Sequence, residues 1–188
     1  AIFDLGNNIT AGDHNITVNY SGDDNYNNVT KGINITVTKA DINPDDVKVN
    51  VTDSTYGNTT IEVIVPVDAT GNVTITVDGE EFTVPVVNGT AIFDLGNNIT
   101  AGEHNITVVY SGDDNYNNVT KNDTITVIKA TIDPNDVKVN VTDSTYGNVT
   151  IEVTVPSDAT GNVTITVDGE EFTVPVVNGT AIFDLGNN

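Results

Sequence analysis

Apolar and polar residues alternate along most of this chain with a period of two. In Val73–Val77, for example, valine and isoleucine occupy every second position and threonine lies between them. Such alternation is typical of a β-strand that has one face in a core and the other in solvent. Residues that favour helices are scarce, and leucine occurs only at Leu5, Leu95 and Leu185. The pattern therefore predicts an all-β chain.

Seven alternating segments occur in residues 41–130, and turn signals separate them. Asp78-Gly79 and Asn88-Gly89 are strong two-residue hairpin signals, predicted to join the third strand to the fourth and the fourth to the fifth. Seven short antiparallel strands indicate a two-sheet sandwich. The predicted strands, lettered A to G, are Val47–Val51, Thr60–Val65, Val73–Val77, Phe82–Val86, Thr90–Leu95, Asn105–Tyr110 and Thr124–Lys129.

The same alternation assigns one face of each strand to the core. Threonine, asparagine and charged side chains, such as Lys48, Glu62 and Thr107, occupy the other face. The predicted inward residues are Val49, Val51, Ile61, Val63, Val65, Val73, Ile75, Val77, Phe82, Val84, Val86, Phe93, Leu95, Ile106, Val108, Tyr110, Ile125 and Val127.

The chain repeats itself. AIFDLGNN occurs at residues 1–8, 91–98 and 181–188, so the period is 90 residues, and residues 1–98 differ from 91–188 at 12 positions. A period of 90 exceeds the roughly 20–50 residues of solenoid repeats and fits one small sandwich domain. Asn19 to Val109, Asn34 to Thr124, Thr38 to Ile128 and Ile64 to Thr154 change polarity at positions predicted to face outward. Ile33 to Asp123 also changes polarity and lies at the start of strand G, where little burial is expected.

Three segments carry a resemblance to a known family: GNVTITVDGEEFTV, NGTAIFDL and AGEHNITVVYSGDDNYNNVT. They resemble the bacterial-type immunoglobulin-like (Ig-like) repeats of giant surface proteins, most closely the adhesin-like proteins of methanogenic archaea. The resemblance implies tandem seven-strand sandwiches in a long extracellular protein at the cell surface, and it carries over no catalytic residue. In phase with the family, residues 1–40 hold strands E–G of one repeat, 41–130 a complete repeat, and 131–188 strands A–E of the next.

Composition excludes several functions. The net charge is −21, from 27 acidic residues against six lysines, which argues against nucleic acid or an anionic membrane as a partner. The absence of cysteine rules out disulfides and thiol chemistry. No apolar run approaches the roughly 18 residues that a membrane-spanning helix needs, so no membrane insertion is expected within this segment.

Asparagine in Asn-x-Ser/Thr sequons provides a possible modification chemistry. The chain has 17 sequons, and N-glycosylation requires an accessible asparagine in an exported chain. Strand parity and turn signals place many of them at the surface, so N-linked glycans are expected. The candidates are Asn50, Asn58, Asn72, Asn88, Asn105, Asn118, Asn140, Asn148, Asn162 and Asn178.

Two acidic clusters are weak candidates for binding calcium, and calcium is the one cofactor that the sequence suggests. Carboxylate and amide oxygens are the ligands that calcium prefers, but the spacing of these residues does not match an EF-hand loop. The alternative, which we favour, is a turn between strands F and G in which Asp and Asn side chains bond to nearby backbone amides. The candidate ligands are Asp23, Asp24 and Asn25 in one copy and Asp113, Asp114 and Asn115 in the other.

No residue pattern supports catalysis. His14 and His104 are equivalent positions at the start of strand F, for which we expect only a role at the strand edge. The leading hypothesis is a non-catalytic structural segment of an extracellular stalk or filament. The alternative is an adhesive module that recognises a glycan or another cell surface. Residues 1–40 and 131–188 hold only parts of a sandwich, so neighbouring copies of the repeat are the expected partners, joined covalently or by strand complementation.

Overall fold

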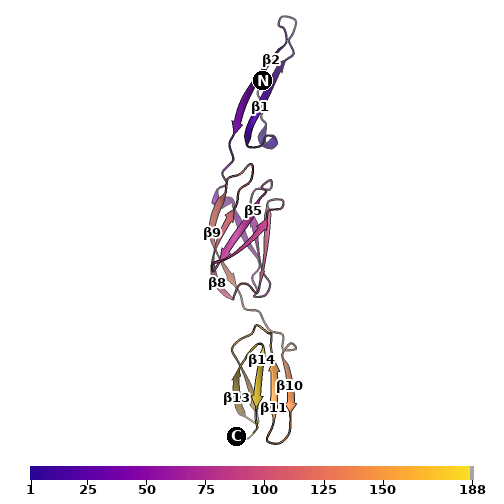
Figure 1. The fold of residues 1–188 in the computed structure, drawn as a ribbon, viewed down its shortest axis with the longest axis vertical. Coiled ribbons are helices and arrows are strands. Elements are labelled where there is room, and N and C mark those ends of the chain that lie inside the picture. The colour runs from indigo at the N-terminus through magenta and orange to yellow at the C-terminus, as the bar shows by residue number, and fades with distance from the viewer. Residues whose placement is uncertain (187–188) are drawn as a thin grey trace. The chain divides into compact units, whose positions relative to one another are not determined.

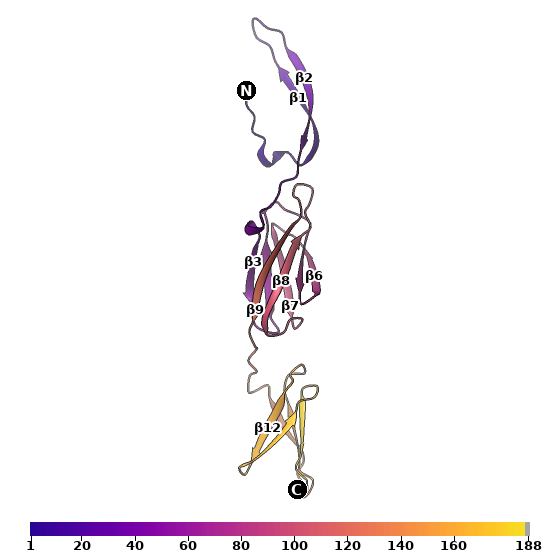
Figure 2. The same cartoon turned by 90° about the vertical axis from the view of Figure 1, so that its left-hand side faces the viewer.

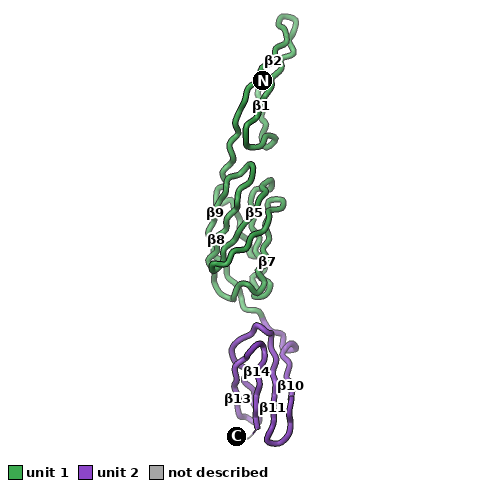
Figure 3. Tube along the Cα trace, in the orientation of Figure 1, with its two compact units in different colours: residues 1–130 green, residues 131–188 purple. Residues whose placement is uncertain are grey.

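The computed structural model describes residues 1–186, which form two compact units, residues 1–130 and the part described from residue 131 onward (Figure 1 and Figure 3). The described residues hold fourteen β-strands, the 3-10 turns η1 (Gly6–Asn8) and η2 (Pro44–Asp46), and no α-helix. The predicted all-β fold is confirmed. None of the described residues lies in a helix long and apolar enough to cross a membrane.

Residues 41–130 fold as a sandwich of two antiparallel sheets, whose strands Figure 2 shows in side view. The three-stranded sheet has the order β3-β4-β7 and the four-stranded sheet the order β6-β5-β8-β9. The last strand begins five residues earlier than predicted, because its polar first half pairs with β8 along the whole length from Tyr110 to Gly102. The strands are β3 (Lys48–Asp53), β4 (Thr59–Ile64), β5 (Asn72–Val77), β6 (Glu80–Pro85), β7 (Thr90–Gly96), β8 (Gly102–Tyr110) and β9 (Val119–Val127).

Both predicted two-residue turns are present, but one connects strands within a sheet and the other connects the two sheets. Asp78 and Gly79 have φ of 51° and 89° and join β5 to β6 within one sheet, where Val77 pairs with Glu80. Asn88 has φ of 50°, Gly89 has φ of 73°, and their turn carries the chain from the sheet of β6 to the sheet of β7. Asparagine and aspartate tolerate this left-handed conformation, and glycine adopts it freely.

The predicted inward face forms the core, with one clear exception. Val51 is 37% exposed, because β3 is an edge strand and its pairing shifts register between Val51 and Asp53. Val49, Phe82 and Val84 pack against the core but are only partly buried. The alternation did not predict the burial of several residues in the segment before β3, in the loops and at the strand ends. These are Ile42, Val47, Ala69, Ala91, Ile99 and Val119, together with the buried Thr59.

The two partial repeats reproduce the corresponding strands of the complete repeat, except at the start of the chain. Residues 1–5 form no strand, although strand E was expected there. The same sequence forms β7 in the complete repeat, where it pairs with β4, and no counterpart of β4 is present beside residues 1–5. The strands are β1 (Gly12–Tyr20) and β2 (Val29–Val37), then β10 (Lys138–Asp143), β11 (Thr150–Thr154), β12 (Asn162–Val167), β13 (Glu170–Pro175) and β14 (Thr180–Asp184).

Candidate functional site

The loop between β8 and β9 is organised by the carboxylate of Asp113. Oδ1 accepts hydrogen bonds from the backbone amides of Asn115 and Tyr116, both at 2.8 Å. Oδ2 accepts from Tyr110 Oη at 2.8 Å and from the amide and hydroxyl of Thr70 at 2.7 and 3.1 Å. Asp113 thereby closes its own turn and also ties the loop to the β4–β5 connection.

These contacts control the ionisation of the two groups. Desolvation acts to raise the pKa of Asp113, but the hydrogen bonds from Thr70, Tyr110 and the turn amides outweigh it and lower the pKa from 3.8 to about 2. Burial, followed by the hydrogen bond to Asp113 and its negative charge, raises the pKa of Tyr110. The charged carboxylate and the neutral phenol are therefore the forms that the fold stabilises.

The first copy of this loop has the same internal bonds. Asp23 Oδ1 accepts from the amides of Asn25 and Tyr26 at 2.8 and 2.9 Å, and Oδ2 accepts from Tyr20 Oη at 2.6 Å. The bond from Tyr20 is the main cause that lowers the pKa of Asp23. Within residues 1–186, the hydrogen bonds that Asp23 accepts in this copy all come from the same loop and from Tyr20 at the end of β1.

The two candidate calcium clusters thus take the form of capped turns, the interpretation that we favoured. Both oxygens of Asp113 and of Asp23 accept hydrogen bonds from protein groups, and Asp114 is exposed beside them. Residues 1–186 contain no group of three or more acidic, histidine or cysteine side chains placed to hold a metal ion. Calcium binding at Asp113, Asp114 and Asn115 stays a prediction.

The loop between β8 and β9 also contacts the linker, residues 40–47, through which the chain enters the complete repeat. Ala40 donates its amide to the carbonyl of Asn115 at 2.8 Å and accepts from the amide of Asn117 at 2.9 Å, which makes a parallel bridge across Tyr116. Asn117 Nδ2 also donates to Asp41 Oδ1 at 2.7 Å. Two β-type hydrogen bonds fix one linker residue, so the joint is structured rather than a free tether.

Side chains extend this joint to the preceding partial repeat. Asn115 Oδ1 accepts from the amide of Ala11 at 2.9 Å. Asp68 accepts from Tyr116 Oη at 2.8 Å and from Asn7 Nδ2 at 3.2 Å. These groups line a small cavity of about 140 Å³. Small-molecule sites usually occupy about 300–1,000 Å³, so the joint does not have the volume of a ligand pocket.

Beyond the joint, the linker is anchored to the sandwich. Asn43 caps η2 by accepting from the amide of Asp45 at 3.0 Å, and η2 packs against β9. Ile42 and Val47 on either side belong to the core, and Lys121 Nζ on β9 donates to the carbonyl of Val47 at 2.7 Å. No segment of residues 40–47 is left without a contact to the domain that it enters.

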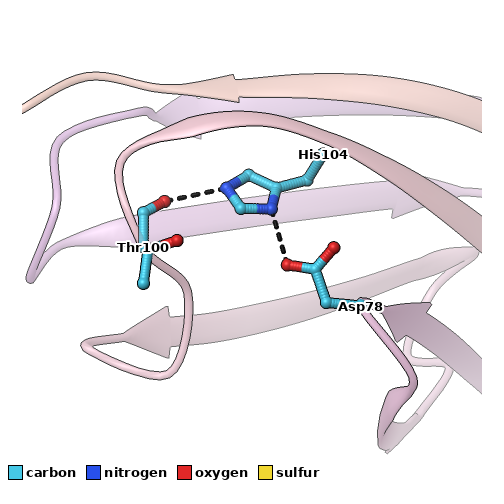
Figure 4. Close-up of polar contacts among 3 residues, drawn as sticks. All are labelled: Asp78, Thr100 and His104. Atoms are coloured by element: carbon cyan, nitrogen blue, oxygen red, sulfur yellow. Dashed lines mark hydrogen bonds and ion pairs between the residues drawn. The ribbon is translucent and has the colours of Figure 1, made fainter.

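A buried histidine joins the start of β8 to the β5–β6 turn. His104 Nδ1 lies 2.7 Å from Asp78 Oδ2 and Nε2 lies 2.8 Å from the carbonyl of Thr100 (Figure 4). Both partner atoms are oxygen acceptors, so the two contacts hold the imidazole ring between the chain before β8 and the β5–β6 turn. The expected role at the strand edge understated this residue. The sequence contained one indication of this contact, the Asp78-Gly79 turn, because folding of the sandwich places Asp78 beside His104.

All ten candidate sequon asparagines are exposed. Asn88 and Asn178 occupy the tips of tight turns with φ of 50°. Asn105 and Asn50 lie on outward strand faces, where their side chains bond to Thr124 and Glu62. The side chains are accessible to an enzyme, and glycosylation of them stays a prediction.

Comparison with known proteins finds similarity for the complete repeat. A search of curated proteins gave no significant match. A solved chain described as "Structural insight into host cell surface retention of a 1.5-MDa bacterial ice-binding adhesin" aligns over 93% of this chain and 62% of its own length, with 20% identity and a TM-score of 0.36. Residues 47–128, which run from the buried Val47 to the end of β9, match the profile of the bacterial Ig-like domain (group 3) family.

Proposed function

We propose that this chain is a spacer segment of an extracellular stalk or filament, in which Ig-like sandwiches follow one another through structured joints. The observation that carries this proposal is the hydrogen bonding of Ala40 to Asn115 and Asn117 across the joint. A linker held in this way stiffens the chain between two repeats, whereas a free linker bends and extends under low force. The proposed role is mechanical and involves no catalysis.

The surface of the complete repeat supports the proposal. Tyr110, Phe93 and Ile61 are fully buried, and the aromatic rings of Phe82 and Tyr116 are partly buried against the same core. Polar and charged residues occupy most outward strand positions, and Ile92 on β7 is an exposed apolar exception. The formal charge of −21 favours solubility over association with other acidic surfaces. N-linked glycans on the exposed sequons would add to this hydrated surface, and exported proteins are the ones that carry them.

The mechanical proposal is tested by pulling the 188-residue chain between its ends in an optical trap or force microscope. Residues 41–130 should unfold in one discrete event that lengthens the chain by roughly 28 nm. This value follows from 90 residues at about 3.6 Å each when extended, less about 40 Å for the folded sandwich.

Gradual lengthening of the complete repeat under low force, without a discrete event, would contradict a mechanical role. A glycan array provides the complementary measurement, because selective binding of one glycan class would favour an adhesive module instead. Asp114→Asn is a suitable control in both assays, since it removes one exposed charge and leaves the Asp113 turn intact.

A further inference from the structure

Two sequons of the complete repeat consist of the same three residues in different structural surroundings. Asn98-Ile99-Thr100 lies between β7 and β8, and Asn105-Ile106-Thr107 lies within β8. In both, the asparagine is exposed and the central isoleucine is buried, with exposed fractions of 3% for Ile99 and 2% for Ile106. A difference in how an enzyme treats the two sequons therefore cannot come from the tripeptide itself.

The spacing of a sequon matches the period of a β-strand. Residues two apart point to the same face of a strand, so a sequon in a strand places its asparagine and its hydroxyl side chain on one face. The outer face of β8 and β9 carries two sequons that run in opposite directions. Asn105 is opposite Thr124, and Thr107 is opposite Asn122.

These two sequons occupy one another's polar groups. Thr124 Oγ1 donates to Asn105 Oδ1 at 3.3 Å, and Thr107 Oγ1 donates to Asn122 Oδ1 at 3.0 Å. β8 is also paired with β5 on one side and with β9 on the other. An enzyme that holds the Asn105 tripeptide must therefore separate β8 from the sheet.

The loop that contains Asn98 leaves its sequon open. Asn98 and Thr100 are both exposed, and among residues 1–186 neither side chain has a hydrogen bond to another protein group. The main chain is held in place, because the amide of Asn98 donates to the carbonyl of Leu95 at 2.8 Å and the carbonyl of Thr100 contacts His104 Nε2 at 2.8 Å (Figure 4). The tripeptide lies outside both sheets, so an enzyme reaches it without breaking strand pairing.

The first copy of this loop has the same backbone contacts. The amide of Asn8 donates to the carbonyl of Leu5 at 2.9 Å, and His14 Nε2 contacts the carbonyl of Thr10 at 2.7 Å. Asn8 and Thr10 are exposed, as Asn98 and Thr100 are. Residues close in sequence are therefore the ones that hold the sequon in this open form.

The other sequons of the complete repeat are less open. In the Asn58 sequon, Thr60 Oγ1 donates to the carbonyl of Asn58 at 3.2 Å. The Asn88 sequon is part of the two-residue turn, in which both backbone groups of Thr90 are bonded across the turn. Asn118 leads directly into β9. The remaining sequons lie in strands and are those of Asn50, Asn72 and Asn122.

We propose that Asn98, which is not one of the ten candidates drawn from the sequence, is an acceptor for N-linked oligosaccharide on the folded chain. Asn105 has the same tripeptide and is not modified once β8 has paired. The proposal rests on the extracellular location in the proposed function, because exported chains are the ones that carry such glycans. It does not depend on the mechanical role.

The modification is a group transfer from a lipid-linked oligosaccharide. A bond forms between Nδ2 of the asparagine and the anomeric carbon of the sugar, and the bond from that carbon to the phosphate oxygen of the lipid carrier breaks. The carrier leaves with the electron pair, and the amide loses one proton to the enzyme. A sequon is defined by its amide and by the hydroxyl two residues later, so the enzyme that recognises it contacts both groups. Both are unoccupied at Asn98 and Thr100.

The test incubates the folded 188-residue chain with a purified oligosaccharyltransferase that accepts the bare Asn-x-Thr tripeptide, together with its lipid-linked oligosaccharide. Mass spectrometry of the glycopeptides measures the initial rate at each sequon. A synthetic peptide of residues 94–111 contains both tripeptides and gives their rates without the fold. After division by the peptide rates, Asn98 should be modified at least about tenfold faster than Asn105, because a central strand opens only together with the sheet around it.

Asn98→Gln is the matched variant. It should remove the glycan at this position and leave the rate at Asn105 unchanged. The melting temperature of the unmodified chain should also stay the same, since the Asn98 side chain makes no bond that glutamine would lose. Equal corrected rates at Asn98 and Asn105 would overturn the proposal, and so would an Asn98 that stays unmodified in the folded chain while the peptide reacts.

Discussion

At the residue scale, one carboxylate organises the part of the complete repeat that meets its neighbour. Asp113 bonds to Tyr110 three residues before it and to the turn amides after it, all within one loop. Its bonds to Thr70 cross 43 residues of sequence. The first set of bonds makes the turn, and the second set attaches that turn to the sandwich.

Replacing Asp113 by asparagine should destabilise the complete repeat by about 2–3 kcal/mol. The amide can accept from the turn but turns its own donors toward Thr70 or Tyr110, so at least one buried bond is lost without replacement. Chemical denaturation followed by circular dichroism measures this loss. Asp114→Asn is the matched control and should change the stability by less than about 0.5 kcal/mol. Equal losses for the two variants would show that the Asp113 bonds contribute nothing specific.

The difference between the unchanged chain and Asp113→Asn should depend on pH. The pKa of Asp113 is about 2 in the folded chain against 3.8 when unperturbed, so the stabilisation is complete above pH 4 and disappears as the pH falls toward 2. With an allowance for solvent screening of this partly exposed group, the pH-dependent part of the difference in unfolding free energy is about 1–2 kcal/mol. A difference that stays constant from pH 7 to pH 2 would contradict the charged-acceptor assignment.

At the scale of elements, the strands depend on turns whose glycines have different surroundings. Gly79 joins two neighbouring strands of one sheet, and a Cβ added there would meet no atom within 4 Å. Gly89 lies between the sheets, where an added Cβ would approach Val67 Cα to 2.7 Å and the carbonyl of Pro66 to 2.8 Å. The sequence Asn-Gly predicts the turn, but only the packing of the β6–β7 turn against Pro66 and Val67 makes glycine essential there.

Gly89→Ala should therefore destabilise the complete repeat by several kcal/mol more than Gly79→Ala. Both substitutions incur the cost of about 1 kcal/mol for a left-handed alanine, and only the first also clashes with backbone. Thermal denaturation of the two variants measures the difference. Similar melting temperatures would show that the chain at Pro66 and Val67 moves away at little cost.

Identical or nearly identical segments in different copies show which elements depend on neighbouring residues and which depend on distant partners. β1 and β2 pair over nine residues in the same way as β8 and β9, although no sandwich surrounds them. Alternation and turn residues therefore favour the same register in both copies of the hairpin. The same does not hold for AIFDL, which forms β7 at residues 91–95 and no strand at residues 1–5. A strand at the edge of a three-stranded sheet requires its partner.

At the scale of the whole chain, electrostatic repulsion is the dominant long-range effect. The formal charge is −21, and residues 41–130 contain 14 acidic residues against three lysines. Salt screens repulsion between exposed charges beyond about 8–10 Å. Sodium chloride should therefore raise the melting temperature by a few degrees.

Calcium at matched ionic strength should add little to this effect, because the oxygens of Asp113 already accept hydrogen bonds from protein groups. Calorimetry in millimolar calcium, with sodium chloride as the control, measures the difference. A sharp rise specific to calcium would show that the loop opens to bind the ion and that the capped-turn interpretation is wrong.

The sequence by itself determined the strands, the two-residue turns, the 90-residue period and most of the core, because alternation and turn chemistry act over a few neighbouring residues. The loop of Asp113 belongs to this group, since the isolated copy around Asp23 forms the same bonds. Only the tertiary structure decided that Val51 is exposed, that His104 is buried against Asp78, and that Ala40 is held by Asn115 and Asn117. Each of these depends on a partner distant in sequence, and the burial of a residue follows from which strands lie beside it rather than from its own pattern.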